Sequence, residues 1–405
     1  MAKVLYLTYD GLADHIGQAQ VLPYLQATAQ RGHQLHVVSF EKKGKVAAIA
    51  KLNNAPAHHG ITFHPQTFTS FPPLVAKIRD ARNLARAASK LASSHSFDLV
   101  HCRSYVPSVS GCCVKQEYGT PFVFDMRGLW PDQRREGGRW RSSNPIFRWL
   151  YQRWKKREAD FVSQADWIVS LTDVCKTEIE SWDSYRGAPI SVCPCSVDTQ
   201  SFYPRNQSQR QAIREQLGVA SNTFLLMYMG SLGTVYLLKE MFAFFQTMKQ
   251  AKRDCKFLFL GQHKCDELLK FAQDLGFTFD AQDILATKSK RDDIPDFCAA
   301  ADAGICFITQ TYSSLGVSPT KFGEYLACGL PTILNSRIGD TEKILNQLAG
   351  GVAVPSFKKQ DLASAAESAL SFDQIDRLQL AARAKSFVDI SHTIDRYDEI
   401  YRSFE

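Results

Sequence analysis

Short apolar runs alternate with longer segments of helical periodicity along the first half of the chain. The runs that predict strands are KVLYLTY, QLHVVSF, FDLVHC and PFVFDMRG, and the helical segments among them are QAQVLPYLQATAQRG, AKIRDARNLARAASKLASS and VSGCCVKQEYG. Strands that alternate with helices favour parallel pairing through right-handed crossovers. The first half therefore predicts a doubly wound α/β domain.

A second cycle of the same kind follows, with strand-like runs TFLLMYMGSLG, CKFLFLG, AGICFIT and LPTILNS. The junction is ISVCPCSVDTQSFYPRNQS, where the last strand-like run gives way to Pro, Ser and Asn. We expect two domains, residues 1–196 and 197–385, and a last helix at about 386–405 that could pack back on the first domain. No fixed-period repeat relates the halves, so their similarity would be one of fold only.

Open parallel sheets bind ligands at the carboxyl ends of their strands, where loops and helix N-termini converge. The expected fold class is α/β, with two Rossmann-like domains that face a central cleft. A length of 405 residues, with 45% hydrophobic and 22% charged residues, fits two globular domains.

Eleven cysteines are scattered without paired CxxC elements, which argues against a zinc site. No signal peptide precedes the first strand-like run, and no apolar run approaches the roughly 20 residues of a membrane span. We expect a protein of the reducing cytoplasm that does not cross a bilayer.

The net charge of +7 is unevenly placed, because arginines, lysines and four tryptophans interleave between Arg127 and Arg157. This segment fits a surface for anionic membrane or phosphate-bearing partners. It also fits a nucleic-acid patch, or a solvated helix face whose tryptophans pack inward.

The stretch MGSLGT follows the first strand of the second domain. Gly230 and Gly233 would let backbone amides approach a phosphate, and Ser231 and Thr234 could add hydroxyl donors. The pattern is neither GxGxxG nor a P-loop, so a simple turn explains it equally well.

The stretch SPTKFGEYLACGLP places a cation and a carboxylate three residues apart where a loop enters a helix. Amides near Ser318 and Thr320 would lie at a helix N-terminus that favours an anion, and Lys321 adds a positive charge. One turn later, Glu324 could accept hydrogen bonds from a ribose diol. The alternative is a surface ion pair between Lys321 and Glu324.

Four segments, SPTKFGEYLACGLPTI, GSLGT, FDMRGLWPD and YDGLADHIGQAQVLPYL, together resemble bacterial glycosyltransferases of the GT-B type. The resemblance covers nearly the whole chain and is close to the retaining group called glycosyltransferase family 4 (group 1), of the surface-polysaccharide type. It implies a diphosphate-binding loop before the helix, with Glu324 on the nucleotide ribose.

The chain departs from the family pattern at three positions. Gly316 stands where the family has a second glutamate, and Ser231 and Leu237 stand where it has an arginine and a lysine. Lys321, with Lys239 as a weaker substitute, would supply the missing charge.

The resemblance also assigns acceptor-side positions to the first domain. Gly17 would permit close backbone approach to the substrates, and Gln18 would face the cleft. His101 and Arg103 end one strand and would lie near the acceptor.

Asp125 and Arg127 end the next strand and are candidates for catalysis together with Lys321. Asp125 stands where many relatives carry a histidine, so its role is open. Breaking a sugar–phosphate bond builds charge on the leaving diphosphate, which Lys321, helix amides and Arg127 could stabilise. No DxD motif occurs in a suitable loop, so we expect no metal and no cofactor.

The sequence therefore predicts a metal-independent glycosyltransferase of the cytoplasm, with retention implied by the resemblance. Its donor would be a nucleotide sugar such as a UDP- or GDP-sugar, and its acceptor a glycan or a polyprenyl-diphosphate-linked precursor. Peripheral contact with an anionic membrane would fit the basic segment. A nucleotide-sugar epimerase of the same fold is the main alternative; a nucleic-acid-binding protein is less favoured, and we expect no nucleic-acid partner.

Overall fold

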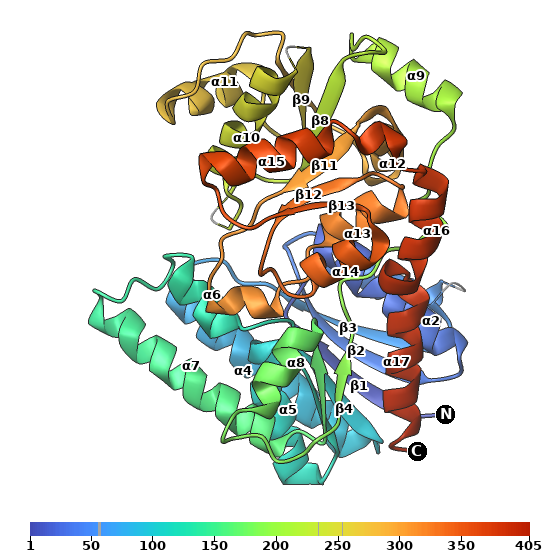
Figure 1. Ribbon diagram of the computed structural model, residues 1–405. Helices are drawn as coiled ribbons and strands as arrows, with labels where there is room; N and C mark the ends of the chain where they lie inside the picture. Colours follow the sequence, from blue (N-terminus) through green and yellow to red (C-terminus); the bar gives the residue numbers. More distant parts are fainter. Residues whose placement is uncertain (56–57, 234, 253) are drawn as a thin grey trace. The chain divides into compact units, whose positions relative to one another are not determined.

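The computed structural model describes residues 1–55, 58–233, 235–252 and 254–405 (Figure 1). The chain forms two compact units: unit 1 comprises Met1–Pro194 with Ser391–Glu405, and unit 2 comprises Cys195–Ile390. This junction lies two residues from the division placed before Val197. None of the helices in the described ranges has the length and apolar character needed to cross a membrane.

Unit 1 is built on a seven-stranded sheet in the order β3-β2-β1-β4-β5-β6-β7, and every pairing is parallel. Its strands are β1 (Lys3–Thr8), β2 (Gln34–Glu41), β3 (Ile61–Thr67), β4 (Leu99–Arg103), β5 (Phe122–Asp125), β6 (Trp167–Ser170) and β7 (Ile190–Val192). Its helices are α1 (His15–Gln20), α2 (Leu22–Gln30), α3 (Val46–Lys51), α4 (Pro73–Ser94), α5 (Tyr105–Tyr118), α6 (Trp130–Glu136), α7 (Pro145–Gln164), α8 (Asp173–Glu180) and α17 (Ile390–Arg402), with the short 3₁₀ helix η1 (Leu52–Asn54).

Unit 2 is built on a six-stranded parallel sheet in the order β10-β9-β8-β11-β12-β13. Its strands are β8 (Phe224–Met229), β9 (Cys255–Leu260), β10 (Ile284–Thr287), β11 (Ala303–Cys306), β12 (Thr332–Asn335) and β13 (Gly351–Val354). Its helices are α9 (Gln207–Gln216), α10 (Leu238–Ala251), α11 (Cys265–Asp274), α12 (Ile294–Ala300), α13 (Thr320–Ala327), α14 (Thr341–Leu348), α15 (Lys359–Ala369) and α16 (Arg377–Val388), with 3₁₀ turns η3 (Arg291–Asp293), η4 (Tyr312–Gly316) and η5 (Phe372–Gln374). The expected class of two Rossmann-like α/β domains is confirmed.

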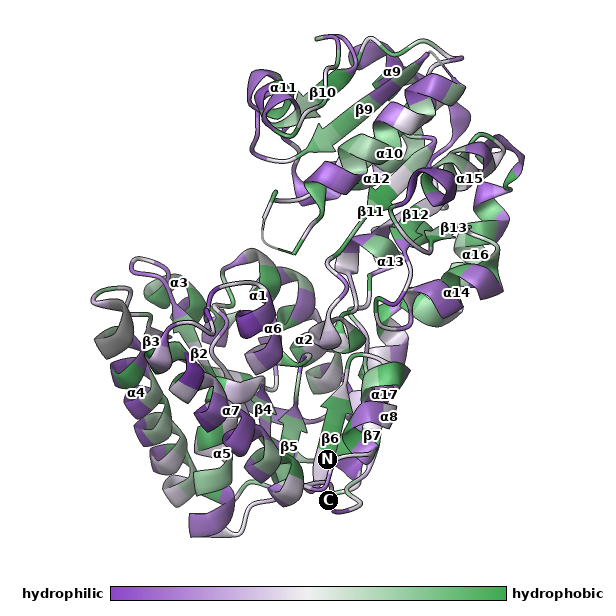
Figure 2. Cartoon of the chain, turned by 60° about the vertical axis from the view of Figure 1, so that its left-hand side comes forward, coloured by the Kyte–Doolittle hydropathy of each residue, from purple (hydrophilic) through white to green (hydrophobic). Residues whose placement is uncertain are grey.

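The apolar strand runs follow from burial on both faces of each sheet. Every residue of β8, FLLMYM, is buried, and its side chains alternate between two clusters. Leu225 and Met227 pack with α13 and α16, whereas Phe224 and Leu226 pack with α10 and α15. In Figure 2 strands such as β6 and β9 are mainly green, while α4 and α7 carry both colours. A sheet covered on both faces needs continuous hydrophobic strands, which is the pattern the sequence shows.

The last helix, α17, belongs to unit 1. Its Tyr397 and Tyr401 are buried, and their hydroxyls reach the ends of β5 and β4. Asp398 on the same helix pairs with His33 at 2.8 Å. These contacts place α17 beside β4, β5 and the residue that precedes β2.

Candidate functional site

The first candidate site lies in unit 2, where β8 ends and α13 begins. Gly230 follows β8 with a φ of 116°, a conformation that favours glycine. A Cβ at this position would stand 3.1 Å from Nζ of Lys321. The missing side chain of Gly230 therefore gives Lys321 its place beside the glycine-rich loop, and the structure brings these two predicted residues together.

Lys321 is a buried cation held by aromatic groups. Only 8% of its surface is exposed, and Nζ donates a hydrogen bond of 3.3 Å to the hydroxyl of Tyr228. Nζ also lies 3.4 Å from the ring centroid of Tyr236, a cation–π contact. Burial lowers the pKa of Lys321 to about 8, against the partial opposition of Cys306 and Glu324. A bound anion would favour the charged form of this lysine.

Glu324 lies one helical turn further along α13 and is equally enclosed, with 4% of its surface exposed. Its Oε1 lies 2.8 Å from Nη1 of Arg291 in η3. Burial raises the pKa of Glu324, although Arg291 and Lys321 both oppose this. The alternative of a surface pair between Lys321 and Glu324 is wrong, because both side chains are buried and the carboxylate pairs with Arg291.

The remaining donor-side candidates make backbone or structural contacts. Ser318 Oγ accepts a 3.1 Å hydrogen bond from the amide of Cys195, which ties the loop before α13 to the start of unit 2. The carbonyl of Ser231 accepts from Tyr228, and that of Gly233 accepts from the amide of Tyr236.

Three other positions complete the donor side. Thr320 is the first residue of α13, and Lys239 is exposed on α10. Thr234 lies outside the described residues. Their roles toward a nucleotide stay predictions.

The second candidate site lies at the carboxyl ends of β4 and β5 in unit 1. Asp125 Oδ2 lies 3.5 Å from Nε2 of His101 and 3.7 Å from Nη1 of Arg103, and Oδ1 lies 4.0 Å from Nε of Arg127. Tyr397 donates to Oδ2 at 3.1 Å. The structure therefore brings together all four residues predicted here.

Asp125 has no exposed surface, and burial alone would raise its pKa. Arg127, His101 and Arg103 outweigh that effect and hold the pKa of Asp125 below its ordinary value. His101 is likewise fully buried, and its Nδ1 lies 3.0 Å from the hydroxyl of Tyr401. The carboxylate of Asp125 is therefore enclosed by cations and a tyrosine hydroxyl, and it is not accessible to solvent in this structure.

Gly17 and Gln18 serve the local fold of the first loop. A Cβ at Gly17 would lie 2.2 Å from the carbonyl oxygen of Gly11, so the close backbone approach is to the chain's own loop. Gln18 Nε2 donates to the carbonyl of Leu12 at 2.8 Å. Glu41 holds the same loop by accepting from the amide of Leu12 at 2.8 Å. Their acceptor-side role stays a prediction.

Several partners escaped the sequence reasoning. Gln20 Oε1 accepts from Arg127 at 3.2 Å and from Arg103 at 3.5 Å, although 107 and 83 residues separate these pairs. Arg291 lies 33 residues from Glu324, and Tyr228 lies 93 residues from Lys321. The two tyrosines of α17 lie 272 and 300 residues from Asp125 and His101. These residues stand in different kinds of element, namely η3, β8 and α17, so no single local signal selects them.

The basic and aromatic segment divides into a packed part and an exposed part. Trp130 lies 5.2 Å from Trp140 and 5.0 Å from Trp154, measured between ring centroids, and Lys155 pairs with Asp132 at 2.9 Å. For these residues the inward-packing interpretation holds. Trp149 and Ile146 on α7 are instead 57% and 67% exposed.

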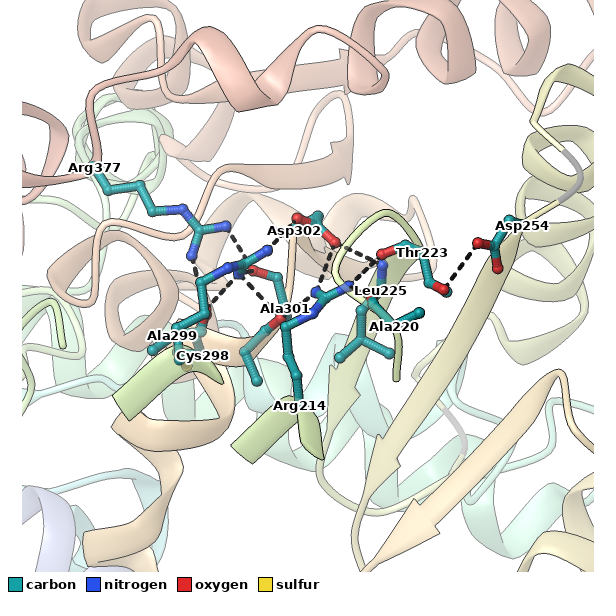
Figure 3. Close-up of polar contacts among 12 residues, drawn as sticks. Arg214, Ala220, Thr223, Leu225, Asp254, Cys298, Ala299, Ala301, Asp302 and Arg377 are labelled. Carbon is teal, nitrogen blue, oxygen red and sulfur yellow. Dashed lines mark hydrogen bonds and ion pairs between the residues drawn. The ribbon is translucent and has the colours of Figure 1, made fainter. Parts of the chain in front are cut away.

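A further charged cluster lies at the C-terminal end of α12, where Arg214 and Arg377 converge (Figure 3) and Arg210 donates to the same carbonyls. Their guanidinium groups donate to the carbonyls of residues 298–301, and Asp302 pairs with Arg210 at 2.7 Å and with Arg214 at 3.2 Å. Across the described ranges, no group of three His, Cys, Asp or Glu residues is arranged to hold a metal ion.

Comparison with known proteins gives two family matches. Residues 19–201 match the model of Glycosyltransferase Family 4, and residues 209–387 match that of Glycosyl transferases group 1. A relative named as a glycosyltransferase, EpsD of Bacillus subtilis (strain 168), is 20% identical over 262 residues. That match covers 63% of this chain and 61% of the relative's length.

Solved structures share the fold. Sucrose-phosphate synthase from Thermosynechococcus elongatus aligns with a TM-score of 0.72 at 13% identity, over 100% of this chain and 99% of that one. HepE of Anabaena in complex with UDP-glucose aligns with a TM-score of 0.68 at 16% identity, over 100% of both chains. These similarities support the GT-B architecture.

Proposed function

Because the chain belongs to the group 1 glycosyltransferases of family 4, we propose that it transfers a sugar from a nucleotide-sugar donor to a glycan or lipid-linked polysaccharide precursor. The observation that carries the proposal is the placement of two buried side chains one turn apart on α13, Lys321 next to Gly230 and then Glu324. A cation and an acceptor one turn apart suit a diphosphate and its ribose. HepE, which shares the fold, was solved with UDP-glucose, in keeping with such a donor.

In this reaction the bond from the anomeric carbon to the diphosphate breaks, and the acceptor hydroxyl forms the new glycosidic bond and loses its proton. Charge grows on the leaving diphosphate, where the Lys321 ammonium would stabilise it most strongly in the transition state. Glu324 would orient the nucleotide through the ribose. We further propose that anomeric configuration is retained, that no metal takes part, and that Asp125 acts by fixing Arg103 and Arg127.

A thermal-shift panel of UDP, GDP, CMP and ADP tests the donor class, because a ligand that binds only the folded state raises Tm. A nucleotide sugar of the selected base should then yield nucleoside diphosphate only when an acceptor is present. NMR of the product reports the anomeric configuration, and EDTA should leave the rate unchanged. Isomerisation of the donor without acceptor would instead support an epimerase.

The exposed part of α7 supports a proposal of peripheral contact with anionic membrane. Trp149 and Ile146 are exposed beside Arg148, Arg153 and Lys156, a combination typical of interfacial helices. Vesicles that contain anionic lipid should sediment the protein at low salt and lose it at high salt.

A matched pair of variants tests this contact. Replacing Arg148, Arg153 and Lys156 with Ser should reduce sedimentation with anionic vesicles. The control replaces three exposed cations of unit 2, Lys359, Arg383 and Lys385, and should sediment like the wild type. Equal losses in both variants would count against a specific surface on α7.

A further inference from the structure

The carboxylate assigned to the ribose already has a cationic partner in this structure. Arg291 Nη1 lies 2.8 Å from Oε1 of Glu324, and the guanidinium lies 4.9 Å from the ring centroid of Phe202. The two partners differ in exposure, because the Arg291 side chain is 42% exposed and that of Glu324 is 5% exposed. The arginine can therefore return to water, whereas the glutamate cannot.

A vicinal diol and a guanidinium offer the same chemistry to a carboxylate, namely two parallel donors. Only one of them can occupy the face of Glu324 that Arg291 now covers. A buried carboxylate left without a donor is strongly unfavourable, so Arg291 leaves Glu324 most readily when other donors replace it.

We propose that Arg291 is a specificity-determining residue of the donor site, whose guanidinium holds Glu324 until the two hydroxyls of a ribose replace it. This inference rests on the proposed function, since it takes Glu324 as the ribose acceptor. The exchange makes donor binding depend on an intact 2′,3′-diol, because a nucleotide without it cannot displace the guanidinium. It also weakens the binding of every ribonucleotide by the free energy of the ion pair that is broken.

Calorimetry of UDP and 2′,3′-dideoxy-UDP, with the GDP and ADP pairs in parallel, tests the exchange. Arg291→Ala should bind the ribonucleotide about 3- to 10-fold more tightly than the wild type, because the ribose no longer has to displace the guanidinium from Glu324. Its affinity for the dideoxy analogue should be unchanged.

Arg205→Ala is the matched control, because Arg205 also pairs with a carboxylate, Asp296 at 2.7 Å, and stacks on an aromatic ring, Tyr203 at 4.0 Å. It should bind both nucleotides like the wild type. Weaker ribonucleotide binding by Arg291→Ala, or an equal gain with the dideoxy analogue, would overturn the exchange while leaving the proposed function intact. If neither the wild type nor the variants bind any of the nucleotides, both proposals are wrong.

Discussion

Two sites in unit 2 enclose cations, and the groups around the cations differ between them. At the end of α12, Arg214 and Arg377 donate to backbone carbonyls (Figure 3), and Arg210 does the same. Asp302 accepts from Arg210 and Arg214. At the start of α13, Lys321 is surrounded by the rings of Tyr228 and Tyr236, and its one described hydrogen bond is to the Tyr228 hydroxyl. The positive charges at the end of α12 are compensated by backbone carbonyls and a carboxylate. The ammonium of Lys321 contacts mainly the faces of two aromatic rings.

This difference distinguishes a cluster that stabilises the fold from a site that binds a ligand. Carbonyls at a helix C-terminus carry partial negative charge, so three guanidinium groups there are stabilised without a ligand. Lys321 has the pKa of about 8 of a cation that is costly to bury, and only an added anion would offset that cost. The arginine cluster should therefore govern stability, and Lys321 should govern activity.

The largest expected effect is on turnover when Lys321 is replaced. Lys321→Met keeps the length of the side chain and removes the charge, so kcat should fall about 10²- to 10³-fold, the range measured for removing one transition-state donor. The Michaelis constant for the donor should change much less, because the diphosphate gains charge as the bond breaks. An effect confined to the donor Michaelis constant would contradict this role.

The same variant tests the burial of the charge through pH. The pKa of Lys321 falls from 10.5 to about 8 on folding, so between these values the unfolded chain binds more protons than the folded protein. Stability from this group therefore rises as the pH rises from about 8 to about 10.5. Lys321→Met lacks this penalty, so its Tm should exceed that of the wild type at pH 7 and the difference should shrink towards pH 10. A constant difference would show that the ammonium is not buried.

The arginine cluster predicts the opposite outcome. Arg214 is 1% exposed and donates to the carbonyls of Ala300, Ala220 and Thr223. Arg214→Met should lower the free energy of unfolding by about 3 kcal/mol. The substitution leaves several buried carbonyls without a donor and removes one of the two cations that pair with Asp302. Urea unfolding measures this loss of stability. The kcat of the remaining folded protein should stay within about twofold of the wild type. A large fall in kcat at unchanged stability would show that the arginine cluster serves activity and not stability.

The sequence predicted the fold through its continuous apolar strands and the site through one short motif. It missed β3, where His64 and Pro65 interrupt the apolar pattern, and the short strands β6, β10 and β13. The Gly230–Lys321 contact was within reach because both residues stand in recognisable segments.

The partners that complete each site were beyond sequence reasoning for a physical reason. Arg291 in η3 precedes Glu324 in α13 by 33 residues, and Tyr397 meets Asp125 across 272 residues. Only the folded sheet order brings such groups to one edge. The local sequence pattern therefore identifies the candidate carboxylates, and only the tertiary structure identifies the side chains that contact them.

A smaller effect is expected at Glu324, where the ligand competes with a protein partner. Glu324→Gln keeps the shape of the side chain but removes its charge, so nucleotide affinity should fall by about 1.5 to 3 kcal/mol, the worth of a charged hydrogen bond. The fold should tolerate the change, because Arg291 is partly exposed and can turn to water. Calorimetry that shows unchanged affinity, with Tm as the control for folding, would place the ribose elsewhere.

The smallest expected effect decides which kind of cluster surrounds Asp125. Tyr397 donates to the Asp125 carboxylate at 3.1 Å, whereas Tyr401 meets His101 Nδ1 at 3.0 Å. Tyr397→Phe and Tyr401→Phe should each cost about 1 kcal/mol of stability, the net worth of one hydrogen bond.

The hydroxyl of Tyr397 stabilises the ionised carboxylate, so its loss raises the pKa of Asp125. The acid limb of the pH–rate profile should therefore move to higher pH in Tyr397→Phe, with a few-fold lower kcat, and stay in place in Tyr401→Phe. If both variants keep the wild-type pH–rate profile and lose stability alike, the cluster at the ends of β4 and β5 only stabilises the fold, as the arginines near α12 do. Asp125 then has no part in positioning Arg127 for the reaction.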